Sequence, residues 1–191
     1  MKKIFLYLLL LMPIFGACKA VKDDYGIANP EQYSRIYLAA AYNGMQQFDL
    51  TAPKPVEIKV FANYSGVLSL AADVSVTMTA DLSLVAKYNS ENGTSFKAIP
   101  TSCFSMGNST SLIPAGATTA SEPAVVNIVT TAFPDDALYL LPIRITSVSD
   151  PSLTVNSELV TLYLGIACTA SSLYVTANPL IDYTVSSTEN W

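Results

Sequence analysis

Cys18 is the residue whose sequence context indicates a specific chemical modification most clearly. It follows the small pair Gly16-Ala17, which fits the narrow pocket of a signal peptidase, and its thiol can form a thioether with diacylglycerol. Lys2-Lys3 gives the chain a basic start, and the apolar run over residues 4–15 is shorter than the ~20 residues that span a bilayer. We therefore predict a signal peptide over residues 1–17, cleaved before Cys18, with an uncleaved membrane anchor as the alternative.

A lipid on Cys18 would decide where the rest of the chain resides. Each buried methylene contributes about 0.8 kcal/mol, so one acyl chain holds a protein marginally and two or more hold it firmly. A Cys18 that carries several acyl chains, palmitate among them, is expected to stay on its membrane. Residues 18–32 are then predicted to form a polar tether between the membrane and the folded domain.

The tether contains Lys22, Asp23 and Asp24, a basic residue followed by paired acidic residues soon after the expected lipid site. This arrangement resembles the export signal of Bacteroidetes-type surface lipoproteins. The resemblance implies that the protein is anchored in the outer membrane and faces the cell exterior. A solvated linker with no export role is the alternative interpretation.

The composition argues against several classes of function. The chain has 10 basic and 15 acidic side chains and no histidine, for a net charge of −5. A nucleic acid or an anionic lipid surface would need clustered Lys or Arg, which this balance does not offer. Without His, the chain lacks the most frequent general base and transition-metal ligand. Since it also shows no nucleophile or metal motif, we expect a non-enzymatic protein without a cofactor or a bound metal.

Two further cysteines, Cys103 and Cys168, are candidates for a disulfide in a chain that leaves the cytoplasm. A bridge between them would close a loop of about 65 residues, which the chain-entropy model values at ~4 kcal/mol. The alternative is a pair of buried thiols that behave as small apolar side chains.

Alternating apolar and polar residues predict strands along most of the chain. In the clearest case, Val56 to Tyr64, the residues Glu57, Lys59 and Asn63 are expected on the solvent face. Pro142 lacks an N–H and is therefore expected at a sheet edge or a bulge. Extended pieces are predicted over residues 35–40, 56–64, 74–80, 96–100, 103–106, 111–113, 124–128, 139–146 and 160–166.

One short helix interrupts these strands. Asp81 is a good N-cap, Leu82, Val85 and Tyr88 could share one face, and Asn92-Gly93 should end the helix. Short strands separated by turns, one helix and no parallel crossover units predict an all-β fold, an antiparallel β-sandwich over residues 33–167. Residues 168–191 are expected to be a C-terminal extension or linker.

Three separated segments carry a resemblance to a known family. Residues 112–116 and 139–145 resemble its strand-and-turn and its penultimate strand. The central signature is that of a domain of unknown function at the N-terminus of Bacteroidetes surface lipoproteins. Here it consists of Leu84-Val85-Ala86-Lys87-Tyr88-Asn89, Asn92-Gly93-Thr94, Phe96 and Ile99-Pro100.

The resemblance covers about residues 33–167 and implies an immunoglobulin-like sandwich similar to Calx-β domains. Family members often precede a carbohydrate-binding module or a glycoside hydrolase family eighteen domain, within gene clusters for polysaccharide use. This chain stops at Trp191 without room for a second domain, so we expect either a naturally short protein or a fragment. No catalytic residue carries over, because the enzyme motifs of those proteins lie in the domain that is absent here.

These observations together predict a non-catalytic surface lipoprotein that acts as a glycan-binding or spacer module in polysaccharide capture. Its expected partners are the membrane, polysaccharide and other surface glycan-uptake proteins. Two alternatives stay open. The chain could be a structural adhesin or assembly subunit that presents a sheet edge, or the N-terminal fragment of a surface glycosidase.

Tyrosines are the candidate sugar-binding residues, because a sugar ring offers one apolar face and a rim of hydroxyls. Tyr42, Tyr64, Tyr163 and Tyr174 lie near turns or on less apolar strand faces, with ordinary packing as the alternative for each. Asp135-Asp136 invites comparison with a calcium loop, but its preceding neighbours supply no side-chain oxygen. A solvated turn is the better interpretation there.

Overall fold

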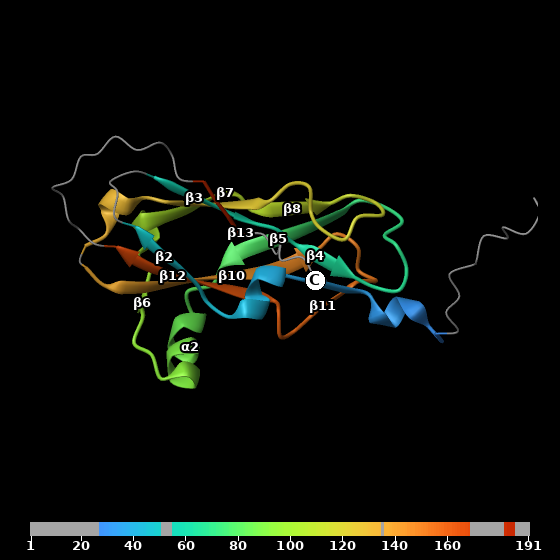
Figure 1. Cartoon of the computed structure of the whole chain (residues 1–191), viewed down its shortest axis with the longest axis horizontal. Coiled ribbons are helices and arrows are strands. Elements are labelled where there is room, and N and C mark those ends of the chain that lie inside the picture. Colours follow the sequence, from blue (N-terminus) through green and yellow to red (C-terminus); the bar gives the residue numbers. More distant parts are fainter. Residues whose placement is uncertain (1–26, 51–54, 135, 169–181, 186–191) are drawn as a thin grey trace, which may run out of the picture. The chain divides into compact units, whose positions relative to one another are not determined.

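The computed structural model describes residues 27–50, 55–134, 136–168 and 182–185, without the side chains of 168 and 182–185. The chain divides into two compact units, residues 1–30 and 31–191, and the three sheets lie in the second (Figure 1). Within the described ranges there is one α-helix, α2 (Leu84–Asn92). The short 3₁₀-helices are η2 (Pro30–Tyr33), η3 (Ala39–Asn43), η4 (Thr101–Cys103) and η5 (Thr130–Ala132).

The largest sheet is built around its longest strand, β10. This strand pairs antiparallel with β12 on one side and with β5 on the other, and β5 pairs antiparallel with β8. Strand β2 adds parallel to β12, and the two-residue strand β6 adds parallel to β10. The bounds are β2 (Gln46–Leu50), β12 (Thr161–Cys168), β10 (Leu138–Val148), β5 (Val74–Ala80), β8 (Thr110–Ile113) and β6 (Lys97–Ala98).

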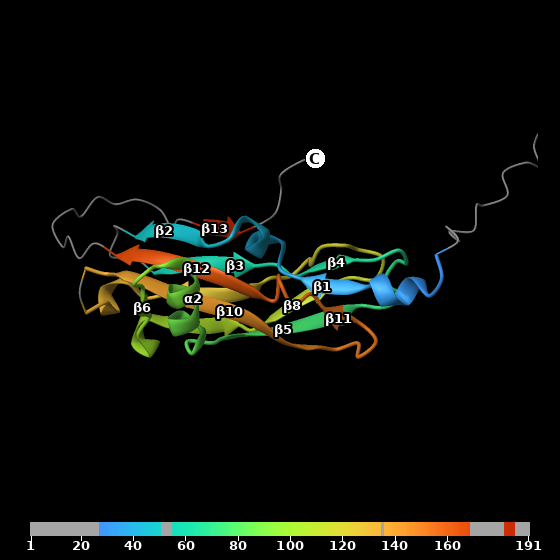
Figure 2. The ribbon, with the colours of Figure 1, turned by 90° about the horizontal axis from the view of Figure 1, so that it is seen from below.

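Two smaller sheets complete the fold. The four-stranded sheet has the order β13 (Asp182–Val185), β3 (Val56–Val60), β9 (Ala124–Ile128) and β7 (Phe104–Asn108). The three-stranded sheet has the order β11 (Thr154–Val155), β1 (Arg35–Tyr37) and β4 (Asn63–Ser65). It lies toward one end of the two larger sheets (Figure 2).

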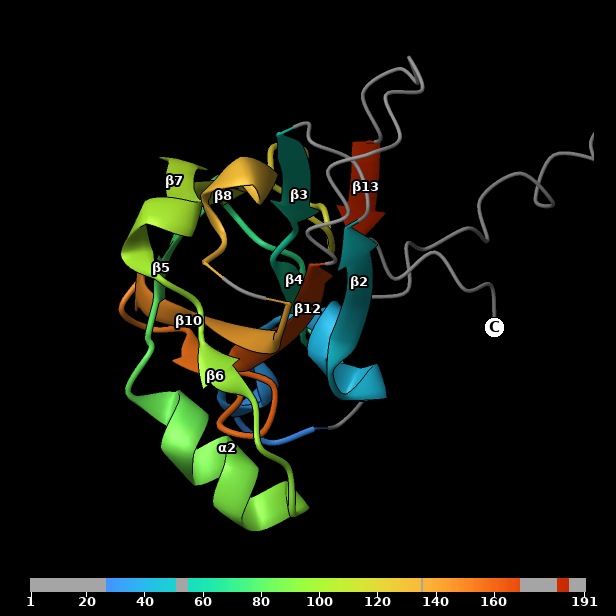
Figure 3. The ribbon, with the colours of Figure 1, turned by 90° about the vertical axis from the view of Figure 1, so that its left-hand side faces the viewer.

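The two larger sheets pack face to face, and their inner side chains form one apolar core. Ile58 and Val126 from the four-stranded sheet belong to the same buried cluster as Leu141, Ile143 and Leu162 from the six-stranded sheet. Seen along the strands, β3 and β7 lie on one side of this core, β10 on the other, and α2 lies beyond β10 (Figure 3). The described residues are thus mostly β-sheet with one α-helix, which confirms the predicted all-β sandwich.

On the first long strand, period-two alternation correctly predicted which residues enter the core, with one exception. Val56, Ile58 and Val60 are buried as expected, but Asn63, expected in solvent, is only 5% exposed. The chain breaks between β3 and β4, and the Asn63 amide then turns inward. Its oxygen accepts the Ala39 N–H at 3.3 Å, and its nitrogen donates to Thr119 Oγ1 at 3.1 Å. These bonds compensate the amide for its lost water. On β10 the burial does not alternate, because Leu140 and Pro142 are buried together with Tyr139, Leu141 and Ile143.

The sheets are not purely antiparallel, which corrects one part of the expectation. Strands β2, β6, β11 and β13 each pair parallel with a neighbour. Each of them brings in a segment that is distant in sequence, so no tight hairpin dictates its direction. The strand expected over residues 35–40 is also shorter, because Ala39 begins the 3₁₀-helix η3.

Pro142 lies inside β10 rather than at a sheet edge or a bulge, so the expectation for this residue was wrong. It is buried, it is paired with Tyr163 of β12, and the register shift of β10 lies further on, between Ile145 and Ser147. Its carbonyl oxygen accepts the N–H of Asp81, the residue after β5, at 2.9 Å. N–H and C=O of one strand residue point to the same side. The missing N–H therefore falls where β5 has ended.

Candidate functional site

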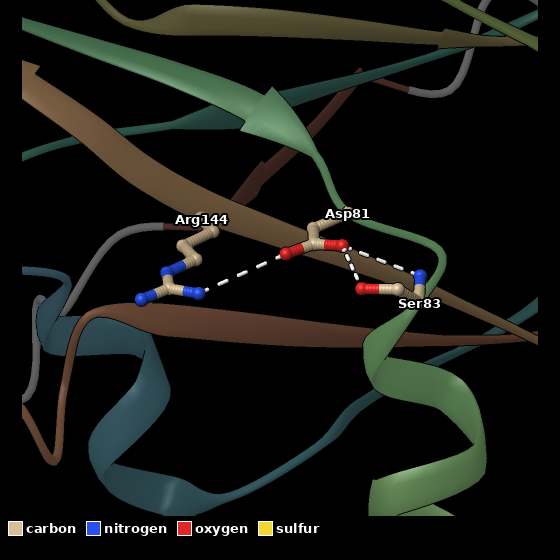
Figure 4. Close-up of polar contacts among 3 residues, drawn as sticks. All are labelled: Asp81, Ser83 and Arg144. Carbon is tan, nitrogen blue, oxygen red and sulfur yellow. Dashed lines mark hydrogen bonds and ion pairs between the residues drawn. The ribbon is translucent and has the colours of Figure 1, made fainter.

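Residues Asp81 and Gly93, both predicted from the sequence to bound a helix, fix the start and the end of helix α2. At its start, the carboxylate of Asp81 accepts hydrogen bonds from the backbone N–H and the hydroxyl of Ser83 (Figure 4). Asp81 therefore caps the turn that precedes the helix, whereas it was expected to be the N-cap itself. At its end, Gly93 adopts φ 64°, the left-handed conformation that the predicted Asn92-Gly93 stop requires.

The loop after α2 is fixed by the side-chain amide of Asn89. Its nitrogen donates to the Phe96 carbonyl at 2.8 Å, and its oxygen accepts the Phe96 N–H at 3.0 Å. The same oxygen accepts the Thr94 hydroxyl at 2.9 Å. One side chain thus satisfies three polar groups of the loop and sets the position of Phe96.

Three aromatic rings meet where this loop and α2 approach the large sheet. Tyr88 of α2 lies against Tyr163 of β12 with ring centroids 4.5 Å apart, and it meets Phe96 edge-on at 6.2 Å. Tyr163 is on the outer face of the sheet, because its neighbours Leu162 and Leu164 point into the core. The helix therefore covers part of an outer face and adds an aromatic surface to it.

Charged side chains surround these rings and are paired with one another. Arg144 Nη1 lies 3.8 Å from Asp81 Oδ2 (Figure 4), and Lys87 Nζ lies 3.8 Å from Glu91 Oε1. Burial raises the pKa of the Tyr163 hydroxyl above its ordinary value, and the negative charge of Glu91 raises it further. The shift extends the protonated form of Tyr163, which can donate a hydrogen bond, further into the alkaline range.

A hollow of about 220 Å³ opens beside the aromatic cluster. It is lined by Thr94, Ser95, Phe96 and Leu138. Leu138, the first residue of β10, is 51% exposed and offers an apolar surface to this hollow. An aromatic ring, an exposed aliphatic side chain and two hydroxyl-bearing residues are thus gathered at one place.

The four candidate tyrosines differ in their exposure and contacts. Tyr64 is 5% exposed, and its hydroxyl contacts Ser34 Oγ and the Leu68 carbonyl, so it is a packing residue. Tyr42 is 71% exposed on η3, and Tyr163 belongs to the aromatic cluster. Tyr174 lies outside the described residues.

Several other predicted site residues also fall outside what the structure describes: Cys18, Lys22, Asp23, Asp24 and Asp135. In the described part, Asp136 is exposed, and no group of three His, Cys, Asp or Glu side chains is placed to hold a metal ion. None of the described helices has the length and apolar character needed to cross a membrane.

Cys103 is buried, and its sulfur lies 3.1 Å from the carbonyl oxygen of Ala132. The side chain of Cys168 is outside the described part of the chain. The disulfide between Cys103 and Cys168 therefore stays a prediction.

Sequence reasoning missed most residues of this site. It singled out Tyr163, but it assigned no role to Asn89, Phe96, Leu138 or Arg144. The signal that could have found Asn89 is its place just before Asn92-Gly93, since a side-chain amide at a helix end commonly bonds the backbone that follows. Arg144 gave no local signal, because its partner Asp81 is distant in sequence.

Comparison with known proteins identifies the family. A family model described as a "-like, N-terminal domain" matches residues 30–152. The chain belongs to this N-terminal domain family. The expected resemblance is thereby confirmed, and the match includes the whole Asn89 loop and the aromatic cluster except Tyr163. A search of curated proteins finds no match.

Solved structures share the fold of this N-terminal domain. A candidate carbohydrate-binding protein from Bacteroides ovatus is 19% identical with a TM-score of 0.55, over 70% of this chain and 37% of that one. A two-domain protein of unknown function from Bacteroides fragilis is 12% identical with a TM-score of 0.56, over 71% and 46%. EndoBT-3987 from Bacteroides thetaiotamicron, solved with a Man5GlcNAc product, is 14% identical with a TM-score of 0.51, over 71% and 30%. The matched part thus spans less than half of each of these proteins.

Proposed function

We propose that this chain is a non-catalytic, lipid-anchored module of the bacterial outer surface that binds glycan or acts as a spacer in polysaccharide capture. The observation that carries the proposal is the family match over residues 30–152, because an N-terminal domain accompanies other functional modules. The fold is then an immunoglobulin-like sandwich behind a cleaved signal peptide. Cys18 is the lipid site in this proposal.

Two further observations support a glycan as the ligand. One solved structure with this fold belongs to a candidate carbohydrate-binding protein, and another contains a glycan product. The outer face at α2 also presents aromatic rings beside hydrogen-bonding groups, the combination that sugar recognition uses. These two proteins are only 19% and 14% identical to this chain. The main support for a glycan ligand is therefore the chemistry of the outer face at α2.

Two experiments test the two halves of the proposal separately. Radiolabelled palmitate should enter the protein in growing cells, and protease added to whole cells should degrade it. A Cys18→Ala chain should take up no label. If the wild-type chain takes up no label, or if protease leaves it intact, the surface-lipoprotein half is wrong.

Retardation in native gels that contain polysaccharides tests the glycan half, and only the spacer role survives if no polysaccharide retards the chain.

A second candidate is the N-terminal module of a longer surface glycosidase. The match to EndoBT-3987 favours this candidate, because the matched part makes up only 30% of the EndoBT-3987 chain. Reading the gene beyond the codon for Trp191 decides the question. An open reading frame that continues into a second domain supports this candidate, and an immediate stop codon eliminates it.

A further inference from the structure

We propose that the hollow beside Phe96, next to the rings of Tyr88 and Tyr163, is a subsite for one uncharged sugar ring of a polysaccharide. This inference rests on the glycan-binding half of the proposed function and names the face that performs it. In Figure 3, α2 and β6 lie on the side of β10 away from β3 and β7, so a ligand bound beside them would be outside the sandwich core.

The lining of the hollow matches the two sides of a sugar ring. Phe96 and Leu138 offer apolar contact to the C–H face. Ser95 carries a hydroxyl on the same lining, and Thr94 Oγ1, which donates to Asn89, still has lone pairs that can accept a bond from a ring hydroxyl. The volume of about 220 Å³ is below the range of about 300–1,000 Å³ that is usual for small-molecule sites. It therefore suits one ring of a polymer rather than an enclosed oligosaccharide.

The subsite is rigid before any ligand arrives. Asn89 fixes both backbone polar groups of Phe96, and Tyr88 supports its ring from the edge. Asp81, held by Ser83, in turn orients the Arg144 guanidinium beside Tyr163. Binding then requires little additional ordering of side chains, which favours even a small contact area.

Two of the cations on this face are paired with acids, an arrangement that suits a neutral ligand. Arg144 lies 3.8 Å from the Asp81 carboxylate, and Lys87 lies 3.8 Å from Glu91. Each of these cations is offset by an acid, so an anionic sugar would meet no net attraction from them. Further along β10, the half-exposed Arg144 guanidinium has N–H donors and the Asp81 carboxylate has lone pairs, which can bond hydroxyls of another ring of the same polymer. Uncharged hexose or pentose polymers are the class that fits.

A shallow subsite for one ring should bind weakly, on the order of millimolar per ring. Binding should therefore be measured with polymers, whose repeated rings multiply the effect. The full chain in mild detergent is run in native gels that contain galactomannan, xylan or mixed-linkage β-glucan as neutral probes, and polygalacturonate as the anionic probe.

Four variants locate the site. Leu138→Asp and Phe96→Leu alter the hollow, and Leu68→Asp is the matched control, because Leu68 is 42% exposed in the segment after β4 and changes the net charge equally. Tyr42→Ala removes a candidate tyrosine that is 71% exposed on η3. Circular dichroism melting confirms that each variant is folded.

We expect at least one neutral polymer to retard the wild-type chain, and Leu138→Asp and Phe96→Leu to reduce that retardation at least threefold, while Leu68→Asp and Tyr42→Ala retain it. Unchanged retardation of both hollow variants, or a loss confined to Tyr42→Ala, would overturn the site and leave the glycan-binding function intact. Retardation by polygalacturonate alone would overturn the neutral class. A wild-type chain that no polymer retards would remove both the subsite and the glycan-binding function.

Discussion

Asn89 bonds the N–H and the carbonyl of Phe96, seven residues further along the chain, at 3.0 and 2.8 Å. A single amide thereby closes the segment that leaves α2 into a fixed loop. The helix, the loop and the aromatic cluster form one structural unit, because Phe96 contacts Tyr88 from this position. Damage to the amide should therefore disturb the loop well before it disturbs the sheets.

Asn89→Ala should destabilise the domain. The change removes three hydrogen bonds and leaves the Phe96 backbone groups without their partner, which should lower the free energy of unfolding by roughly 1–3 kcal/mol. Urea titration followed by circular dichroism measures the loss. Asn92→Ala is the control, because Asn92 makes one exposed bond to the Tyr88 carbonyl, and it should cost no more than about 0.5 kcal/mol. Equal losses in the two variants would contradict the role of Asn89.

Gly93→Ala should lower stability through the backbone alone. The residue has φ 64°, and an added Cβ would meet nothing within 4 Å. The cost is therefore conformational, about 1 kcal/mol. Gly93→Asn should recover part of the loss, since asparagine tolerates the left-handed region better than alanine. Chemical denaturation of the three chains is the test, and an alanine variant as stable as wild type would refute the argument.

The sequence predicted the core far better than the edges of the sheets. The inner residues of β3 and β5 alternate with polar neighbours, so their burial follows from periodicity alone. On β10, Leu140 lies between two inner residues and is buried as well, which periodicity does not predict. Strand β2 was missed because only Phe48 and Leu50 of its five residues are apolar, and its partner β12 is distant in sequence. The position of Pro142 was predicted wrongly because a proline inside β10 is tolerated only where β5 has already ended, and the end of β5 relative to β10 is set by tertiary structure.

The candidate site was predictable only in its local part. Gly93 as the end of the helix and the shared face of Val85 and Tyr88 followed from helix rules. The meeting of Tyr88 with Tyr163, and of Asp81 with Arg144, depends on how α2 packs on the sheet. No periodicity in a single sequence encodes such contacts, since each side chain would look like an ordinary surface residue by itself.

Stability should fall at high pH in a way that depends on Tyr163. Burial and the nearby Glu91 raise the pKa of this hydroxyl above 10.0 in the folded chain. Above about pH 10 the unfolded chain loses this proton more readily than the folded one, so alkali favours unfolding, and the contribution is intact below that pH. Urea titrations at several pH values should show a shallower alkaline decline for Tyr163→Phe. Parallel declines in the two chains would exclude the effect.

Replacing Asp23 and Asp24 with alanine should separate lipidation from surface display. The change leaves Cys18 and the residues before it untouched, so palmitate should still enter the protein. If the acidic pair directs export, protease added to whole cells should now spare the chain. Substituting Glu57, an acidic residue on β3, with alanine is the control and should leave surface exposure unchanged. Full digestion of the double alanine variant would show that the pair is an ordinary linker.

The position of Pro142 has a practical consequence for the segment between β5 and β6. At that point one edge of β10 changes from an antiparallel partner to a parallel one, and the chain between Ala80 and Lys97 leaves the sheet. Little of the ladder depends on what this excursion contains. Loops of other lengths and chemistry could be grafted there, which makes the domain a scaffold on which new recognition surfaces can be built.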